Sequence, residues 1–371
     1  MKVYRKFKEL GYHRAAVPEV FGGEGLSGRK MHILVEELSW GSSGFGIVFG
    51  VDSFPTLFAI MSFDDYLTEN YINPWLEDKE AKYRGCWGVT EPGHGSDTLV
   101  FSSLFQTPCE AVEPDQVIIE KDGDEWIIKG AKSSFITNAP VSTHVALHTN
   151  LNPLKGNPGY GCVVPLDLPG VTKGEPIIKL GQKDAPQGEL IFNDVRIPNR
   201  NVPIEPDTFH PLTGRIPLTQ ILCITSAWMA ANSTGLARAA FEEALSYSKE
   251  RVQGGKPICE HQLIKKKLYD MFVKVETARA YSRRVMEHVW ERNLMKFEYD
   301  ASYGHAVAAQ VYCKQIAYEV AHDALQIYGG YGTTKDYLVE KLFRDSRVKL
   351  IEDGTTDILS LECADDVIRN Y

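Results

Sequence analysis

Residues 116–130 read QVIIEKDGDEWIIKG, two short runs rich in β-branched and aromatic residues on either side of Asp122-Gly123. An Asp-Gly pair between such runs is typical of the two-residue turn of a β-hairpin. Further short apolar runs follow at 145–147, 161–164 and 190–192, and prolines and glycines separate them. Because no helical pattern lies between these runs, this part of the chain predicts a sandwich or barrel and disfavours a parallel sheet.

The apolar pattern changes to a helical period on both sides of this region. The first 85 residues contain short helical stretches between turn signals such as Gly22-Gly23. From about 216 onward, apolar residues recur at three- and four-residue steps, which marks one face of a helix. These residues are Leu268, Met271, Phe272, Val275 and Ala278. Residues 312–328 form a second long helical pattern, which ends at Gly329-Gly330. The sequence therefore predicts an α+β protein that is mostly α, with domains at 1–85, 86–200 and 201–371.

Composition narrows the class of partner. The chain has 371 residues and a formal net charge of −9, which disfavours nucleic acid as a partner. Its seven cysteines are scattered and form no CxxC pair or Cys/His cluster, so we expect neither a disulfide framework nor a metal site. The N-terminus lacks the apolar run of a secretory signal, and no uninterrupted apolar segment approaches the roughly 18 residues of a membrane span. We expect a cytoplasmic protein that does not enter a membrane.

Four motifs suggest flavin and phosphate chemistry. Residues 88–97 read GVTEPGHGSD, a loop whose glycines and hydroxyls suit close approach to phosphate or carbonyl oxygens. Residues 132–138, KSSFITN, follow a strand. Residues 251–257, RVQGGKP, offer an arginine that can hold a pyrophosphate, and residues 326–332, QIYGGYG, end a helix. Residues 351–358, IEDGTTDI, contain a carboxylate in a glycine turn.

In this order and spacing, the four motifs resemble the acyl-CoA dehydrogenase family over about residues 8–368. The resemblance implies an N-terminal helical domain that is shorter than usual, a central β-sandwich or barrel and a C-terminal four-helix bundle, with FAD as cofactor. It implies that Thr90 bonds the polar edge of the flavin ring and that Ser96 faces a phosphate. Phe135 would stack on the ring, and Thr137 would donate toward its hydride-accepting nitrogen. The implied cofactor-binding residues are Thr90, Gly95, Ser96, Phe135, Thr137, Arg251, Gln326, Gly329, Gly330, Thr355 and Asp357.

The resemblance also implies an oligomer and a catalytic base. In the family the arginine at the position of Arg251 reaches the FAD of a neighbouring subunit, which implies a dimer of dimers. A glutamate commonly precedes the Gly-Thr pair as the base, and here Asp353 stands in that place. The flavin would take a hydride from the β-carbon of an acyl thioester while Asp353 removes the α-proton. A carboxylate in an apolar pocket is a stronger base, because desolvation raises its pKa. The family's usual electron acceptor is an electron-transferring flavoprotein.

Departures from the family pattern leave the substrate open. Residues 221–228 contain no basic residue where an arginine is usual, and Ser360 stands near the place of a second arginine. The favoured function is dehydrogenation of an acyl-CoA, and an alicyclic or otherwise unusual acyl group is among the candidate substrates. A carrier-protein thioester, a nitroalkane-oxidase-like reaction and a non-catalytic flavin protein are the alternatives. The connection at 98–121 is longer than usual and is either a wall of the acyl pocket or a surface loop.

Overall fold

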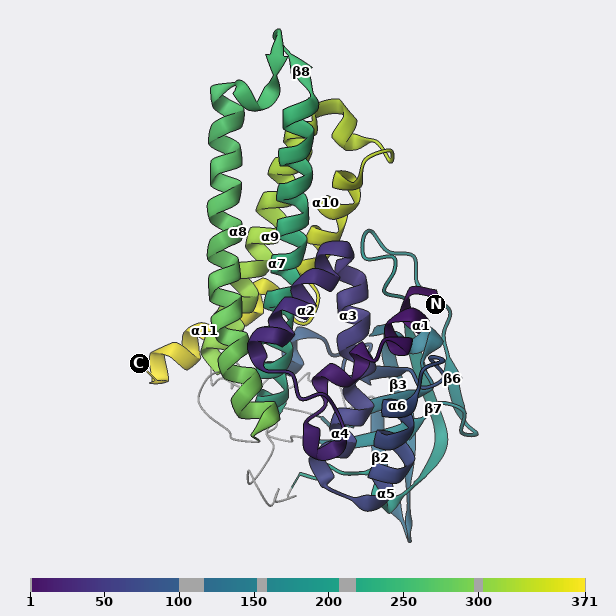
Figure 1. Cartoon of the computed structure of the whole chain (residues 1–371). Helices are drawn as coiled ribbons and strands as arrows, with labels where there is room; N and C mark the ends of the chain where they lie inside the picture. The colour runs from purple at the N-terminus through teal and green to yellow at the C-terminus, as the bar shows by residue number, and fades with distance from the viewer. Residues whose placement is uncertain (1, 100–116, 152–158, 207–217, 297–302, 371) are drawn as a thin grey trace.

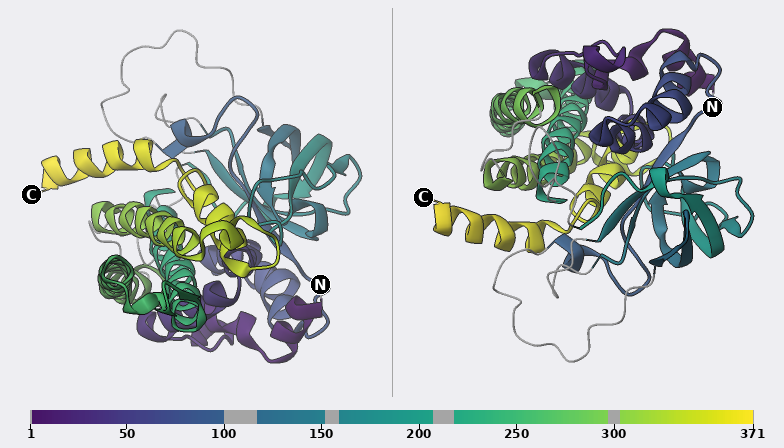
Figure 2. Two further views of the ribbon diagram at one scale, coloured as in Figure 1. Left: turned by 90° about the horizontal axis from the view of Figure 1, so that it is seen from above. Right: turned by 90° about the horizontal axis from the view of Figure 1, so that it is seen from below.

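The computed structural model describes residues 2–99, 117–151, 159–206, 218–296 and 303–370 (Figure 1). Most of the long connection at 98–121 therefore lies outside the described residues. Within them the chain runs from helices through strands to a long helical bundle, and the predicted α+β fold, mostly α, is confirmed. Figure 2 shows the strands on one side of the molecule and the bundle on the other.

Helices form the N-terminal part. They are α1 (Lys2–Glu9), α2 (Gly28–Gly41), α3 (Ser43–Asp52), α4 (Phe54–Ser62), α5 (Asp65–Leu67) and α6 (Asn73–Glu77). Ser42 caps α3, because its hydroxyl accepts a hydrogen bond from the Phe45 N–H at 3.3 Å. Among the described residues, one stretch, Ser43–Ser62, is long and apolar enough to cross a membrane, and 89% of its 18-residue apolar window is buried inside the protein.

Two small sheets form the middle of the chain. Their strands are β1 (Gly85–Gly88), β2 (Val117–Asp122), β3 (Glu125–Thr137), β4 (His144–Thr149), β5 (Tyr160–Pro165), β6 (Val171–Lys173) and β7 (Gln187–Pro198). One sheet has the order β1-β4-β5 and the other β2-β3-β7-β6. The predicted hairpin at Asp122-Gly123 is confirmed, since β2 and β3 pair in antiparallel register. A shared apolar core that includes Val145, Cys162 and Phe192 joins the two sheets.

Long helices build the C-terminal part. They are α7 (Leu218–Glu250), α8 (Gln262–Val289), α9 (Tyr303–Tyr328), α10 (Leu338–Lys349) and α11 (Thr356–Asn370). A β-ribbon made of β8 (Val252–Gln253) and β9 (Lys256–Pro257) joins α7 to α8 at one end of the bundle (Figure 1). Met271, Val275 and Ala278 of α8 are buried as predicted, but Phe272 is half-exposed, so it does not belong to the buried face.

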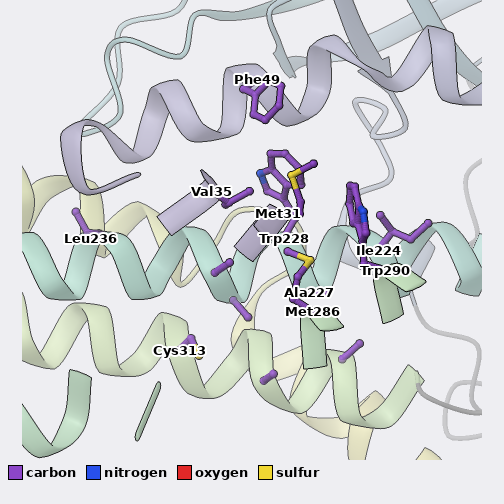
Figure 3. Packing of buried hydrophobic residues seen from close by; sticks show 14 of the residues in the cluster. Met31, Val35, Phe49, Ile224, Ala227, Trp228, Leu236, Met286, Trp290 and Cys313 are labelled. Atoms are coloured by element: carbon purple, nitrogen blue, oxygen red, sulfur yellow. The ribbon is translucent and has the colours of Figure 1, made fainter. Parts of the chain in front are cut away.

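The N-terminal helices pack on the bundle through one apolar core (Figure 3). Met31 and Val35 of α2 and Phe49 of α3 lie beside Trp228 of α7. The Trp228 indole N–H donates to the Gly46 carbonyl at 3.1 Å, which satisfies the polar end of a buried aromatic ring. The N-terminal helices and the bundle therefore share a core, and α9 lies on the opposite side of α7 from these helices (Figure 1).

Candidate active site

Asp353 lies in the short turn between α10 and α11. Its backbone is left-handed, with φ of 49°, and Gly354 follows with φ of 85°. Aspartate tolerates this conformation better than most residues, and glycine adopts it without a steric penalty. The turn thus presents a carboxylate at the point where the chain reverses between two helices.

The Asp353 carboxylate contacts the bundle through a glutamine. Gln310 Nε2 of α9 donates to the Asp353 backbone oxygen at 3.1 Å and to its Oδ2 at 3.2 Å. Burial raises the pKa of Asp353 above its ordinary value, although the Lys314 ammonium and the Gln310 hydrogen bond act in the opposite direction. A partly exposed carboxylate whose pKa is raised by desolvation suits a general base that substrate can reach.

The neighbouring acid, Glu352, has a different environment. Its Oε1 lies 2.8 Å from Lys349 Nζ, and the Lys349 side chain is fully buried. Gln182 Nε2, from the segment before β7, donates to the same oxygen at 2.9 Å. Glu352 therefore forms an ion pair with Lys349 of α10 and accepts a hydrogen bond from the β domain, whereas Asp353 is held by α9.

The loop at 88–97 lies against this turn. Ser96 Oγ accepts a hydrogen bond from the Thr355 N–H at 3.1 Å, and α11 contacts the 3₁₀ turn Ser96–Leu99. A methyl group placed on Gly95 would meet no atom within 4 Å, so the backbone there borders open space. The structure therefore brings Ser96 into contact with Thr355, with Gly95 next to the one and Asp353 two residues before the other.

The second predicted motif joins the same loop to β3. The Thr90 hydroxyl lies 2.7 Å from Ser133 Oγ, and the Ser133 N–H donates to the Thr90 carbonyl at 3.0 Å. Phe135 is 66% exposed, so it is not a core residue of the sheet. Thr137 Oγ1 accepts from Gln187 Nε2 at 3.1 Å. An exposed phenyl ring on a strand next to a glycine-rich loop fits the edge or face of a planar ring system.

Arg251 and the Gly329-Gly330 turn form a separate cluster. They line a hollow of about 1100 Å³ at the end of the bundle that carries the β-ribbon. The Arg251 guanidinium lies 5.2 Å from the centre of the Tyr331 ring. Gly329 has φ of 59°, and an added methyl group at either glycine would meet no atom within 4 Å. This open backbone beside an arginine suits a diphosphate or another anion.

The two clusters are far apart within one chain. Helix α9 carries Gln310 near Asp353, and its Ile327 lines the hollow with Arg251, so the helix rises by about 26 Å between these two ends. Gln326, the residue before Ile327, is exposed. One chain therefore does not place Arg251 beside Asp353. Asp357 is exposed on the first turn of α11 and belongs to the Asp353 end of the bundle.

The sequence interpretation missed the residues that hold the turn Glu352–Gly354. These are Gln310, Lys314, Lys349 and Gln182. A usable signal existed for two of them, since Gln310 and Lys314 interrupt a largely apolar helix at a four-residue spacing. Among the described residues, no group of three or more His, Cys, Asp or Glu side chains could hold a metal ion.

Comparison with known proteins identifies the family. Models of the N-terminal, middle and C-terminal domains of acyl-CoA dehydrogenases match residues 1–76, 86–195 and 219–368. The mitochondrial short-chain specific acyl-CoA dehydrogenase of Bos taurus is 30% identical over 369 residues, which cover 99% of this chain and 82% of that protein. The structure of butyryl-CoA dehydrogenase from Megasphaera elsdenii is 26% identical with a TM-score of 0.83, covering 99% of this chain and 90% of the other. A structure described as the electron transferring flavoprotein of Acidaminococcus fermentans is also 26% identical, with a TM-score of 0.82, over 100% of this chain and 90% of the other. The chain belongs to the acyl-CoA dehydrogenase family.

Proposed function

We propose that this member of a flavin-dependent family of CH–CH oxidoreductases uses FAD to dehydrogenate an acyl thioester, with Asp353 as the base. The observation that carries the proposal is the placement of Asp353. Its carboxylate is held in a left-handed turn, its pKa is raised by burial, and the turn is bonded to the glycine-rich loop through Ser96. This arrangement sets a strong carboxylate base beside a loop suited to a phosphate-bearing cofactor.

The residues of the glycine-rich loop and of β3 fit the flavin end of FAD. Phe135 offers an exposed ring, and Gly95 borders open space. Thr90, in the loop, and Thr137, at the end of β3, offer hydroxyls. Thr355 and Asp357 continue this surface onto α11. Bound FAD would supply the hydride acceptor. The chain itself would orient the thioester, exclude water from the reacting carbons and take the α-proton on the Asp353 carboxylate.

The second cluster fits the diphosphate of FAD bound mainly by another copy of the chain. Gln326, Gly329, Gly330 and Arg251 lie too far from Asp353 to share one cofactor with it inside a single subunit. An open backbone beside an arginine is nevertheless what a diphosphate requires. We therefore propose a homo-oligomer, a dimer of dimers, in which each FAD contacts two subunits. An electron-transferring flavoprotein is the proposed acceptor, and the cytoplasm is the proposed compartment.

An FAD site shared between two subunits predicts that Arg251→Leu weakens FAD binding about 10–100-fold, because a hydrogen bond to a charged group contributes about 1.5–3 kcal/mol. Flavin absorbance per mole of protein after gel filtration, followed by FAD titration, measures this loss. Arg196→Leu is the matched control. Arg196 is a half-exposed arginine of β7 that pairs with Asp122 and Glu125, and its loss is expected to leave the FAD content unchanged. Equal FAD affinity in the Arg251 variant and the wild type would contradict the shared site.

The nature of the thioester carrier is a separate question. Residues 221–228 of α7 are all buried and contain no basic residue, so this stretch offers no cation to a CoA phosphate. Ser360 on α11 is exposed, and its hydroxyl donates to the Thr356 carbonyl at 2.6 Å. Because neither residues 221–228 nor Ser360 offers a cation to CoA, a carrier-protein thioester is the second candidate substrate beside acyl-CoA.

Anaerobic titration of the purified holoenzyme separates the candidates. We expect the oxidised flavin band to bleach on addition of an acyl-CoA, with an alicyclic acyl group among the first esters tested. Bleaching by the same acyl group only on a carrier protein would favour the second candidate. Bleaching by a nitroalkane but by no thioester would replace the proposal with an oxidase-like reaction. An unbleached flavin with every compound would support a non-catalytic protein.

A further inference from the structure

Lys314 is a fully buried cation that faces the turn carrying Asp353. Its ammonium donates to the Glu352 carbonyl at 2.5 Å and to the Gly354 carbonyl at 3.3 Å. These two oxygens lie on either side of Asp353 in the chain. A buried ammonium costs several kcal/mol in desolvation unless it is well compensated, so its presence in the interior of a helical bundle calls for a specific role.

Gln310, one helical turn before Lys314, completes the contact. Its Nε2 donates to the Asp353 carbonyl at 3.1 Å. Three consecutive carbonyl groups, from Glu352 to Gly354, therefore accept hydrogen bonds from two α9 side chains spaced four residues apart. The turn connects two other helices, α10 and α11, so this contact fixes it against the centre of the bundle.

The orientation of these carbonyls sets the orientation of the peptide N–H groups. In a trans peptide the N–H and C=O bonds point in opposite directions. Carbonyls directed at α9 therefore direct the N–H groups of Asp353, Gly354 and Thr355 away from it. The Thr355 N–H confirms this direction, since it donates to Ser96 Oγ of the loop at 88–97. Successive N–H groups that point to one side of a turn can form a concave donor site for an oxyanion.

We propose that Gln310 and Lys314 are positioning residues, which clamp the Glu352–Gly354 carbonyls against α9 so that the Asp353 carboxylate and the N–H groups of its turn face the substrate side. This inference rests on the proposed function, because Asp353 is the assigned base. Aspartate is one methylene shorter than glutamate, so its carboxylate reaches the reacting carbon only from a firmly placed backbone.

The charge of Lys314 has an effect of its own. Its ammonium lowers the pKa of Asp353 against the larger effect of burial, and Glu352 and Lys349 are the other charged groups that act on both residues. Burial in turn lowers the pKa of Lys314 to about 8. Removing the ammonium therefore raises the pKa of Asp353 further. The acid limb of the pH–rate profile for flavin reduction then moves to higher pH.

The experiment compares Lys314→Met with Lys314→Gln in the FAD-loaded protein. The methionine keeps the side-chain volume without a donor, and we expect a 10–100-fold lower rate of flavin reduction with little change in KM. We also expect faster hydrogen exchange in a peptide spanning 350–357, which is a readout independent of turnover. The glutamine supplies a neutral donor, so it is expected to recover part of the rate while its acid limb stays shifted to higher pH.

Lys8→Met is the matched control. Lys8 on α1 is equally buried, donates to the Tyr83 carbonyl at 2.5 Å and pairs with Asp78 at 3.0 Å, yet it lies in the N-terminal helices. Its loss is expected to lower the melting temperature without moving the pH profile or the exchange of 350–357. If Lys314→Met does not fold, Gln310→Leu tests the same clamp through the hydrogen exchange of 350–357, because Gln310 also donates to the Asp353 carboxylate and its rate alone would not isolate the carbonyl contact.

The outcomes separate the two proposals. Wild-type rate, pH profile and hydrogen exchange in Lys314→Met and Gln310→Leu, together with loss of reduction in Asp353→Asn, would overturn the clamp and leave the base assignment intact. Full reduction by Asp353→Asn would instead overturn the base. Faster exchange at 350–357 in the Lys314 variant would then still establish the clamp as a structural contact.

Discussion

Replacing Asp353 by asparagine is expected to leave the FAD content unchanged and to slow flavin reduction by an acyl thioester about a thousandfold, within the usual range for loss of a general base. The amide has nearly the same shape as the carboxylate but cannot take the α-proton. Asparagine also tolerates the left-handed backbone of this turn, with φ of 49°, so the local fold is expected to persist. Anaerobic stopped-flow absorbance of the oxidised flavin measures the rate directly.

The adjacent acid provides the control for this prediction. Glu352 is held by Lys349 and Gln182, so Glu352→Gln is expected to change the rate far less than the Asp353 substitution does. The opposite pattern, with a fast Asp353→Asn and a slow Glu352→Gln, would move the base to Glu352. In the wild type, the rate is expected to fall as the pH drops through the raised pKa of Asp353, because only the ionised carboxylate accepts the proton.

The sequence predicted those features that depend on neighbouring residues in the chain. The hairpin at Asp122-Gly123 and the helix closed by Gly329-Gly330 follow from local turn chemistry, and both are present. Asp353 was singled out by the family resemblance, in which an acid immediately precedes the Gly-Thr pair, and this short motif does lie in a turn. Helix α9 extends further toward the N-terminus than predicted, to Tyr303, since small residues there blur the apolar period.

Features that depend on distant residues were missed. Strands β1 and β4 pair in parallel through Cys86 and Val145, although the pattern disfavoured a parallel sheet. An apolar run does not encode which distant strand it will join. Lys314 and Gln310 were missed as well, because their partners lie about forty residues later in the chain and meet them only when α9 packs against the α10–α11 turn.

Acidification below pH 6.5 is expected to destabilise the folded protein steeply, because several histidines are buried as neutral rings. Burial is the largest cause of a lowered pKa in each: about 4 for His13 and His32 and about 3 for His148, against an ordinary 6.5. The pKa of His144 is also lowered to about 4, but this ring is only partly buried, so it contributes less to the pH dependence of stability. Between pH 6.5 and about 4 the unfolded chain binds these protons and the folded chain does not, so stability falls as the pH falls.

The expected size of this loss is large. Each fully buried histidine contributes about 1.4 kcal/mol per pH unit, so the three together give about 4 kcal/mol per unit. That is a substantial part of the 5–15 kcal/mol that typically separates folded from unfolded protein. Melting temperatures of the holoenzyme at pH 7.5, 6.5 and 5.5, at fixed protein and FAD concentrations, are expected to fall with increasing slope.

A single variant assigns part of this slope to one ring. The His148 ring packs with its centre 5.3 Å from that of Phe58 and 6.0 Å from that of Trp87, and within the described part of the chain its Nε2 has no hydrogen-bond partner. His148→Leu therefore removes a buried proton acceptor without breaking a known hydrogen bond at that nitrogen. We expect a melting temperature close to that of the wild type at pH 7.5 and a higher one at pH 5.5, since a leucine cannot draw a proton on unfolding. Parallel melting curves for the two proteins across this pH range would show that the acid sensitivity arises from other groups.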